Sequence, residues 1–244
     1  MKAGRRSFPL DRVAITLLVL AALVFAGRHW LRDHPQHNPW APFAIDDPPG
    51  WATAGKLVAL RDDPALCRGA LGRAGIDYAA LPPVGSGQCL RSDRTVIAPD
   101  AARGLSLVPR PADATCAVGA GLAVWLRHSV QPAAQRVLGS PVARIEHLGT
   151  ASCRRIGGGE AGSWSEHTTG NAIDIAAFVL ADGRRIVVRS DWSGDGDAAT
   201  FLRLVRDGAC EVFAATLSPD YNAAHADHFH LDQAARGRGW KTCR

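Results

Sequence analysis

Several motifs that define common enzyme classes are missing from this sequence. None of its 6 cysteines forms a C-x-x-C pair, which argues against a zinc ribbon or a thioredoxin-type site. The glycines at 157–159 are not followed by the Gly-Lys-Ser/Thr ending of a phosphate-binding loop. No serine lies in a nucleophile elbow, so Ser-His-Asp catalysis is a poor interpretation. The stretch 191–196 matches the first half of a calcium loop, but Leu202 stands where a bidentate Glu is required.

The body of the chain also lacks an excess of positive charge. The formal net charge is +5, and residues 1–33 hold six Lys or Arg against two acidic residues. The rest of the chain therefore has 22 basic and 21 acidic residues, close to neutrality. A nucleic-acid-binding surface needs a concentrated basic patch, so no nucleic-acid partner is expected.

The chain has a single long apolar run, the 14 residues Val13–Ala26, which basic residues flank on both sides. This length suits the apolar region of a signal peptide and is short for a membrane span of about 20 residues. Val24-Phe25-Ala26 is an acceptable cleavage pattern, whereas an uncleaved run could extend to Leu31 and act as an anchor. We expect residues 1–31 to be a signal peptide or a signal anchor that engages the cytoplasmic membrane. Either alternative places the remainder in the periplasm, with inner-membrane anchoring if the segment is uncleaved.

Composition divides the remaining chain into two parts. Residues 32–53 are rich in proline and are predicted to be a linker, since proline at this density stiffens a chain and blocks regular structure. Residues 54–244 are predicted to form one α+β domain, with a small antiparallel or mixed sheet and flanking helices. Helices are expected over about 63–75, 115–138 with a break or kink near Pro132, and 197–208; strands are expected over 94–98, 104–108, 142–147, 172–180, 184–188, 211–216 and 228–232.

The cysteines are even in number and widely spaced, which is typical of disulfides in an exported protein. Buried free thiols in a cytosolic protein are the alternative. Because six cysteines allow 15 pairings, the sequence does not fix the connectivity. Pairing of sequential neighbours is our prediction: Cys67–Cys89, Cys116–Cys153 and Cys210–Cys243.

Residues with metal-binding chemistry gather in two stretches, 165–174 and 225–232, which together contain four histidines and three aspartates. On a strand over 172–180, alternation places Asp174 with Ala172 and Ala176 on one face, opposite Ile173, Ile175 and Ala177. His228 and His230 share a face of the last strand for the same reason.

Two neighbouring strands would present Asp174 and His230 to a common cleft, with His167 completing the set from the preceding loop. Two histidines and a carboxylate that leave one position open are what a catalytic zinc centre requires. The alternative is that these are ordinary polar residues of hairpins. We predict a zinc site with ligands His167, Asp174 and His230.

A general base must lie beside the zinc-bound water, and two residues are candidates. His228 is favoured by strand geometry, while Asp227 qualifies only if the strand has not yet begun. His225 is a third nearby imidazole, expected to hold substrate or to support another residue. Asp232 is interpreted as a residue at the end of the strand.

The motifs S-x-H-x-x-G-x-A-x-D and H-x-x-H-x-H resemble the signatures of zinc peptidases that include D-alanyl-D-alanine carboxypeptidases, the penicillin-insensitive murein endopeptidase, lysostaphin-type enzymes and the hedgehog fold. Residues from about 50 to 244 resemble more closely the bacterial extensin-like C-terminal family, although proline-hydroxyproline repeats are absent. The stretches that carry this resemblance are Cys116, residues 125–139 with VQPAA, Ser152–Arg154, SEHTTGNAIDI, 201–203, 208–210, HADHFHLD and the terminal Cys243-Arg244.

This resemblance implies a hedgehog- or carboxypeptidase-like fold with metal ligation by His167, Asp174 and His230. It implies a base at His228 or Asp227 without choosing between them, because the chain matches the pattern of both branches. Arg154 resembles an arginine that steadies the substrate or the oxyanion. Ser165 either contacts substrate or shapes the loop.

The main functional hypothesis is a zinc-dependent peptidase or amidase that acts on peptidoglycan peptide bonds in a Gram-negative envelope. The alternative is a non-catalytic domain that binds the wall or a partner and keeps the fold and the metal. A secreted lytic enzyme is a third hypothesis, which the lack of a recognisable wall-targeting module disfavours. Which bond is cut is left open by the sequence.

Overall fold

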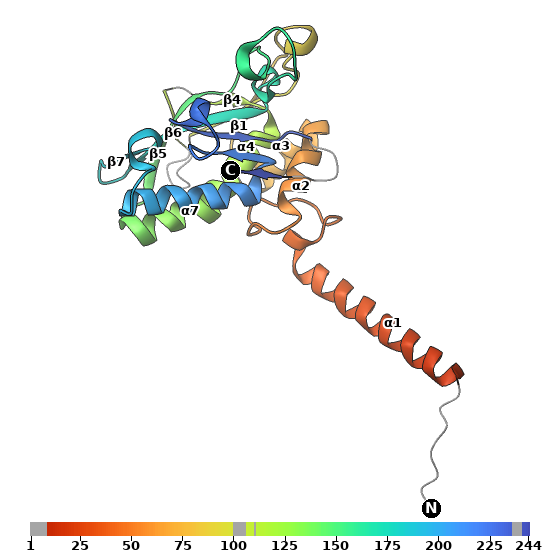
Figure 1. Cartoon of the computed structure of the whole chain (residues 1–244). Helices are drawn as coiled ribbons and strands as arrows, with labels where there is room; N and C mark the ends of the chain where they lie inside the picture. The colour runs from red at the N-terminus through yellow and green to blue at the C-terminus, as the bar shows by residue number, and fades with distance from the viewer. Residues whose placement is uncertain (1–8, 100–105, 110, 236–240) are drawn as a thin grey trace, which may run out of the picture.

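The computed structural model describes residues 9–99, 106–109, 111–235 and 241–244. Figure 1 shows one long helix, α1, that projects from a domain built of sheets and helices. Of the strand predicted over 104–108, residues 104 and 105 lie outside the described part. The domain is α+β, with three disulfides.

Helix α1 (Pro9–Asp33) contains the apolar run and is longer than that run. Its segment Asp11–Asp33 is long and apolar enough to cross a membrane, and the most apolar window of this segment is not buried by the rest of the chain. At 1.5 Å per residue the helix spans about the thickness of a bilayer. An N-terminal helix of this kind is consistent with anchoring in a membrane.

The segment predicted as a linker is partly packed into the domain. It forms the short turn η1 (Pro35–His37), and further along Phe43 and Ile45 are buried in the hydrophobic core. His128 is within hydrogen-bond distance of the Ile45 carbonyl, 3.1 Å away. The packed structure therefore begins before residue 54, although prolines dominate this part of the sequence.

At the start of the domain the helix predicted over about 63–75 is confirmed, but a shorter helix before it was not predicted. Helix α2 (Thr53–Ala59) continues into η2 (Leu60–Asp62), and Asp63 caps α3 (Pro64–Arg73) by accepting a 2.9 Å hydrogen bond from Leu66 N–H. The remaining N-terminal elements are β1 (Tyr78–Leu81), η3 (Gly87–Cys89), β2 (Arg94–Ile97), β3 (Leu107–Val108), β4 (Asp113–Ala114), α4 (Cys116–Trp125), η5 (Leu126–Val130), α5 (Gln131–Ala133) and η6 (Ala134–Leu138).

The second half of the domain carries most of the main sheet. Its elements are β5 (Val142–Gly149), η7 (Ile156–Gly158), η8 (Glu166–Thr169), β6 (Ala172–Leu180), β7 (Arg185–Val187), α6 (Val188–Asp191), α7 (Asp197–Val212), β8 (Ala215–Leu217), η9 (Ala223–His225), β9 (Phe229–Asp232) and β10 (Thr242–Cys243). The sequence prediction missed β1, β4 and β10, which are short strands. It also ended α7 at Gly208, four residues early.

Two sheets organise these strands. A 3-stranded sheet has the order β1-β2-β4, and a 7-stranded sheet has the order β10-β8-β9-β6-β5-β3, with β7 paired to β6. Most pairs are antiparallel, but β10 with β8 and β3 with β5 are parallel, so of the two predicted alternatives, antiparallel or mixed, the sheet is mixed. Strand β6 lies in the middle, between β9 and β5.

The helices α4 and α7 supply the core beneath the main sheet (Figure 1). Trp125 of α4 is fully buried, lies edge-on to Phe178 of β6 and Phe213, and donates its indole N–H to the Val205 carbonyl at 2.7 Å. The helix containing Trp125 continues past Pro132 through two π-helical segments, which is how the chain accommodates the predicted break.

The predicted alternation of β6 is correct from Ile173 to Ile175 and fails further along the strand. The register between β5 and β6 shifts so that Glu146 pairs with Ala177 and His147 with Ile175, leaving Ala176 without a partner. This extra residue reverses the alternation, so that Phe178, rather than Ala177, joins Ile175 in the core cluster.

Two of the three predicted disulfide pairings are wrong. The bonds are Cys67–Cys116, Cys89–Cys153 and Cys210–Cys243, and only the last was predicted. Sequential pairing assumes that each bond closes a local loop. Here α3 instead packs against α4, which brings Cys67 to the first residue of that helix.

Candidate metal centre

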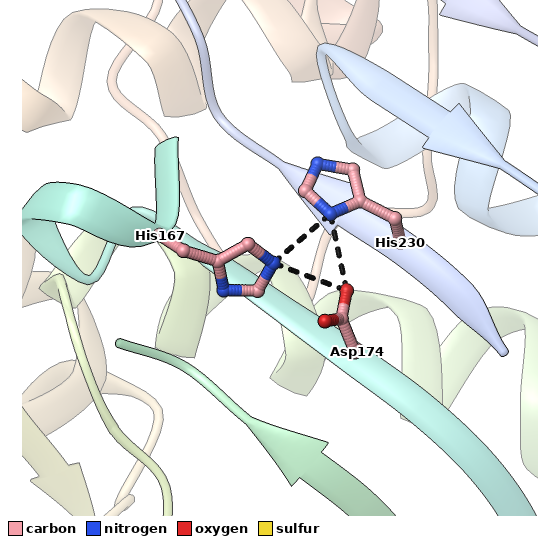
Figure 2. Close-up of side chains that lie close together, drawn as sticks. All are labelled: His167, Asp174 and His230. Atoms are coloured by element: carbon pink, nitrogen blue, oxygen red, sulfur yellow. Dashed lines mark hydrogen bonds and ion pairs between the residues drawn. The ribbon is translucent and has the colours of Figure 1, made fainter. Parts of the chain in front are cut away.

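Three polar side chains converge where β6 meets β9. Asp174 and His230 are direct partners across these antiparallel strands, and His167 reaches them from η8 (Figure 2). Asp174 Oδ1, His167 Nε2 and His230 Nδ1 form a triangle in which each pair of atoms is 3.1 Å apart. The structure therefore brings together the three residues that the sequence predicted as metal ligands.

The loop before β6 determines where His167 lies. Ser165 Oγ accepts a hydrogen bond from His167 N–H at 3.3 Å and so caps η8. Gly170 then reverses the chain with φ of 75°, a left-handed conformation that favours glycine. A Cβ at Gly170 would lie 2.9 Å from the Arg91 guanidinium. Ser165 was predicted either to contact substrate or to shape the loop. The structure shows that its side chain caps η8 and so shapes the loop.

The hydrogen bonds behind the site fix the proton positions on both histidines. His167 Nδ1 lies 3.2 Å from the Thr150 carbonyl oxygen, which can only accept, so Nδ1 carries a proton. His230 Nε2 lies 3.0 Å from a carboxylate oxygen of Asp232 and is likewise protonated. When both rings are neutral, as metal binding requires, the opposite nitrogens, His167 Nε2 and His230 Nδ1, carry no proton and can act as ligands.

The centre of the triangle is thus surrounded by three acceptor atoms: two ring nitrogens and one oxygen of Asp174. Three lone pairs at 3.1 Å repel one another unless a cation lies among them. Zinc binds His nitrogen and carboxylate oxygen at about 2.0–2.2 Å, and tetrahedral ligands at that distance are roughly 3.3 Å apart. The observed spacing and donor set therefore fit a zinc ion with one further position open.

Two pKa shifts show how strongly these side chains interact. Burial raises the pKa of Asp174, but hydrogen bonds from His167 and His230 outweigh burial and hold this pKa well below its ordinary value. Burial lowers the pKa of His230, but hydrogen bonds to Asp174 and Asp232 outweigh it and raise the pKa to about 9. In the metal-free protein a proton on His230 thus takes the place of the cation.

His228 and Asp227 form a hydrogen-bonded pair at the edge of this centre. His228 Nδ1 lies 2.8 Å from Asp227 Oδ1, and its Nε2 is directed towards the site, 3.5 Å from Asp174 Oδ1. The His228 side chain is 12% exposed and that of Asp227 is 46% exposed. The imidazole is therefore the group that faces the three candidate ligands, while the carboxylate contacts the ring from the more exposed side.

His225 lies on the outer side of the same cluster. Its ring centroid is 5.3 Å from that of His228 and 5.9 Å from that of His230. Its Nδ1 is 2.8 Å from the side-chain oxygen of Asn222, which also accepts a hydrogen bond from Ala224 N–H. Burial, followed by the charges of His228 and His230, lowers the pKa of His225 to about 4, so it is neutral at physiological pH.

Arg154 is exposed, and its charge also contributes to the low pKa of His225. Its backbone carbonyl accepts hydrogen bonds from Ser165 N–H and Thr168 Oγ1, which join its loop to η8. The neighbouring bond Cys89–Cys153 ties this loop to η3. The predicted substrate-binding arginine is thus anchored through its backbone and leaves its guanidinium on the surface beside the site.

The sequence analysis missed two supporting residues, Thr150 and Asp232. Asp232 follows His230 by two positions on a strand, so alternation places it on the same face. That signal was available, but the position at the strand end was taken as incidental. Thr150 contributes a backbone carbonyl, for which no side-chain pattern exists.

With this geometry described, the comparison with known families can be stated. Residues 65–244 match the family described as extensin-like protein C-terminus, and the chain belongs to that family. No curated protein and no solved structure matches the chain.

Proposed function

We propose that this protein is a zinc-dependent peptidase or amidase that acts on the peptide bonds of peptidoglycan. The observation that carries the proposal is the triangle of three possible metal-binding atoms, one each from His167, Asp174 and His230, that lie 3.1 Å apart. The resemblance of the two motifs to zinc peptidases of the hedgehog and D-alanyl-D-alanine carboxypeptidase type supports it. When bound at this site, zinc supplies a water of lowered pKa and polarises a carbonyl group.

The residues around the triangle have separate roles in this proposal. His228 accepts a proton at Nε2, because its Nδ1 proton is held by Asp227. Asp227 fixes the tautomer and the orientation of His228 and supports the imidazolium that forms, as a carboxylate behind a catalytic histidine does in other hydrolases. Both candidates for the base are thereby used, one as the base and the other as its orienting partner.

Substrate contact falls to the exposed side of the site. The Arg154 guanidinium is placed to bind a carboxylate or a developing oxyanion of the wall peptide. His225 is neutral and offers its Nε2 to the peptide, since its Nδ1 is occupied by Asn222. Helix α1 anchors the domain to the inner membrane, with the site in the periplasm, where peptidoglycan lies.

The test is digestion of isolated peptidoglycan by the purified domain, with mass analysis of the products and metal analysis of the protein. We expect about one zinc per chain and cleavage that stops with a chelator and resumes with zinc. His167→Ala should lose both zinc and cleavage. Glu160→Ala, an exposed change in the loop between β5 and η8, is the control that should retain both. A preparation that binds no zinc contradicts the proposal.

The alternative function, a wall- or partner-binding domain that keeps the metal, predicts a different pattern. Such a protein would bind zinc and peptidoglycan fragments without releasing products. In that case His228→Gln would still restore wall integrity in cells, whereas His167→Ala would not. If both variants restore wall integrity, the catalytic and the binding hypotheses are both contradicted, because each requires the metal.

A further inference from the structure

The segment that follows α1 is fixed to the domain by a set of close contacts. Lys56 Nζ donates to the Pro35 carbonyl at 2.7 Å, and Ala52 N–H donates to the Gln36 carbonyl at 3.2 Å. Gly50 lies so close to this turn that a Cβ there would be 2.7 Å from the Gln36 oxygen. Helix α1 therefore continues into a packed turn and not into a flexible tether.

Aromatic rings extend this attachment onto the end of α1. Trp30 stacks on His34 and His37, with ring centroids 4.5 and 5.3 Å apart. His37 in turn lies 5.9 Å from the Trp51 ring, and its Nδ1 accepts a hydrogen bond from Trp51 N–H at 3.3 Å. The end of the helix and the start of α2 are thus linked ring to ring.

Two tryptophans next to this attachment are unusually exposed. Trp40 is 83% exposed and Trp51 is 67% exposed, whereas Trp125 in the core is fully buried. Tryptophan is enriched at membrane–water interfaces, where its ring sits among the lipid headgroups. Figure 1 shows that the segment carrying these residues lies between α1 and the rest of the domain. The exposed rings are therefore in the part of the domain nearest a membrane that α1 crosses.

A groove of about 620 Å³ lies between the end of α1 and the loop around Trp40. Arg28 and Arg32 line it one helical turn apart, and neither is in an ion pair within the described residues. The nearby His29 is paired with Asp33 at 3.1 Å. The groove thus combines two free guanidinium groups with an exposed indole and Phe25.

The position of these arginines along α1 matches the depth of lipid phosphates. Arg12 and Arg32 are separated by about 30 Å along the helix axis, which is the thickness of a bilayer's hydrocarbon core. When Arg12 is at the cytoplasmic surface, Arg32 lies at the opposite headgroup layer, and Arg28 reaches the same layer by extending its side chain. Phe25, three residues before Arg28, lies on the same face of the helix, deeper in the bilayer.

We propose that this groove binds the phosphate headgroup of an anionic phospholipid in the outer leaflet of the membrane that α1 crosses. Arg28 and Arg32 bind the phosphate, Phe25 contacts the acyl chains, and the Trp40 ring covers the headgroup. The inference rests on the membrane anchoring that is part of the proposed function, and it is independent of zinc and of hydrolysis. Because the turn after α1 is packed, the bound lipid also sets the orientation of the whole domain on the membrane.

Lipid retention by the full-length protein tests this site. The protein is extracted in mild detergent, mixed with equal amounts of phosphatidylglycerol and phosphatidylcholine, and analysed by native mass spectrometry. We expect retention of phosphatidylglycerol over phosphatidylcholine. Each basic group near an anionic lipid surface strengthens binding by about fivefold, so Arg28→Gln with Arg32→Gln should weaken phosphatidylglycerol retention by about 25-fold.

Matched variants separate this site from general effects of charge. Arg136→Gln with Arg189→Gln removes two exposed arginines from the domain and should leave retention unchanged. Trp40→Ser should lower retention, and Trp40→Phe should lower it less because the ring is kept.

Three results would overturn the proposal: equal retention of the two lipids, no loss in the Arg28/Arg32 variant, or a mature chain in cells that begins after Ala26. His167→Ala distinguishes the two proposals, because it should lose hydrolysis and keep the lipid. If the wild-type protein shows no hydrolysis but still retains phosphatidylglycerol selectively, the lipid site is supported and the proposed hydrolytic function is contradicted.

Discussion

The two sides of the candidate site differ in how firmly they are held. On the inner side, His167, Asp174 and His230 are mostly buried, and each histidine is backed by an acceptor, the Thr150 carbonyl or the Asp232 carboxylate. On the outer side, Asp227 is 46% exposed and Arg154 lies on the surface. The inner side is organised before any substrate arrives, whereas the outer side is free to adapt to one.

This difference is what the proposed reaction would require, since it needs a metal that stays bound and a substrate that is bound only briefly. A metal site needs fixed ligand directions, which the pairing of β6 with β9 and the hydrogen bonds behind it supply. A substrate site needs groups that can reach and release a peptide. Substitutions on the two sides should therefore affect different measured quantities.

The largest effect on the outer side is expected from His228→Gln. Loss of a general base lowers turnover by about 10²–10⁴-fold, while zinc content should stay at the wild-type level because His228 is not a ligand. Asp227→Asn should reduce turnover less, since the base remains and only its orientation and charge support are weakened. The measurement is the rate of product release from peptidoglycan together with the zinc content of each variant.

Loss of zinc in the His228→Gln protein would contradict the separation of metal-binding and catalytic residues, because it would make His228 a ligand. Wild-type turnover in the same protein would exclude it as the base. His128→Gln is the matched control, because His128 is not part of the site and contacts the Ile45 carbonyl.

A smaller effect, in a different quantity, is expected on the inner side from Asp232→Asn. The substitution keeps the shape of a 2% exposed side chain and removes the charge behind His230. Removing a supporting partner of a metal ligand typically weakens metal affinity by about 10–100-fold. We expect zinc affinity to fall in this range, with turnover near wild type once the site is saturated. Competition with a chromophoric chelator measures the affinity.

An unchanged zinc affinity in the Asp232→Asn protein would show that this carboxylate only fills space. A loss of turnover at saturating zinc would place Asp232 in the reaction. Asp220→Asn, which alters an exposed carboxylate bonded to Trp192, provides the comparison.

The smallest effect concerns stability and pH in the metal-free protein. His230 has a folded-state pKa of about 9, above its ordinary value of 6.5, so its protonation stabilises the fold fully below pH 6.5. That contribution is lost as the pH rises towards 9, so we expect the free energy of unfolding of the metal-free protein to fall over this range. With zinc bound the trend should not appear, because deprotonated ligands bind zinc more strongly as the pH rises.

Denaturant unfolding of chelated and zinc-loaded protein between pH 6 and 9 measures this difference. If the free energy of unfolding depends on pH equally in the chelated and zinc-loaded proteins, the proton on His230 and the zinc ion do not occupy the same place. His230→Gln should remove the pH dependence of the metal-free form.

The sequence predicted the inner side well, because strand alternation is a local property. Asp174 and His230 were placed on facing positions by the period of two along each strand, and β6–β9 pairing confirms this. The same rule failed at Phe178, since the register shift beside Ala176 depends on the neighbouring strand β5. Residues further along one strand are therefore predictable only until its partner introduces an irregularity.

Features that depend on contacts between distant parts of the chain were harder to predict from the sequence. The pairing of Cys67 with Cys116 depends on how α3 packs against α4, which no cysteine spacing encodes. Phe43 and Ile45 sit among prolines, so composition indicated a linker while tertiary packing buries both side chains. The choice between Asp227 and His228 could not be made because the strand start was unknown. The structure begins β9 at Phe229, which frees Asp227 to turn back onto His228.

The pairing of Asp174 with His230 has a consequence for the timing of synthesis. The two residues are 56 positions apart, the first on β6 and the second on β9. A growing polypeptide holds two of the three ligands long before the third emerges from the ribosome. The set of three is therefore complete only once β9 has been made, and any nascent product that stops before β9 lacks it.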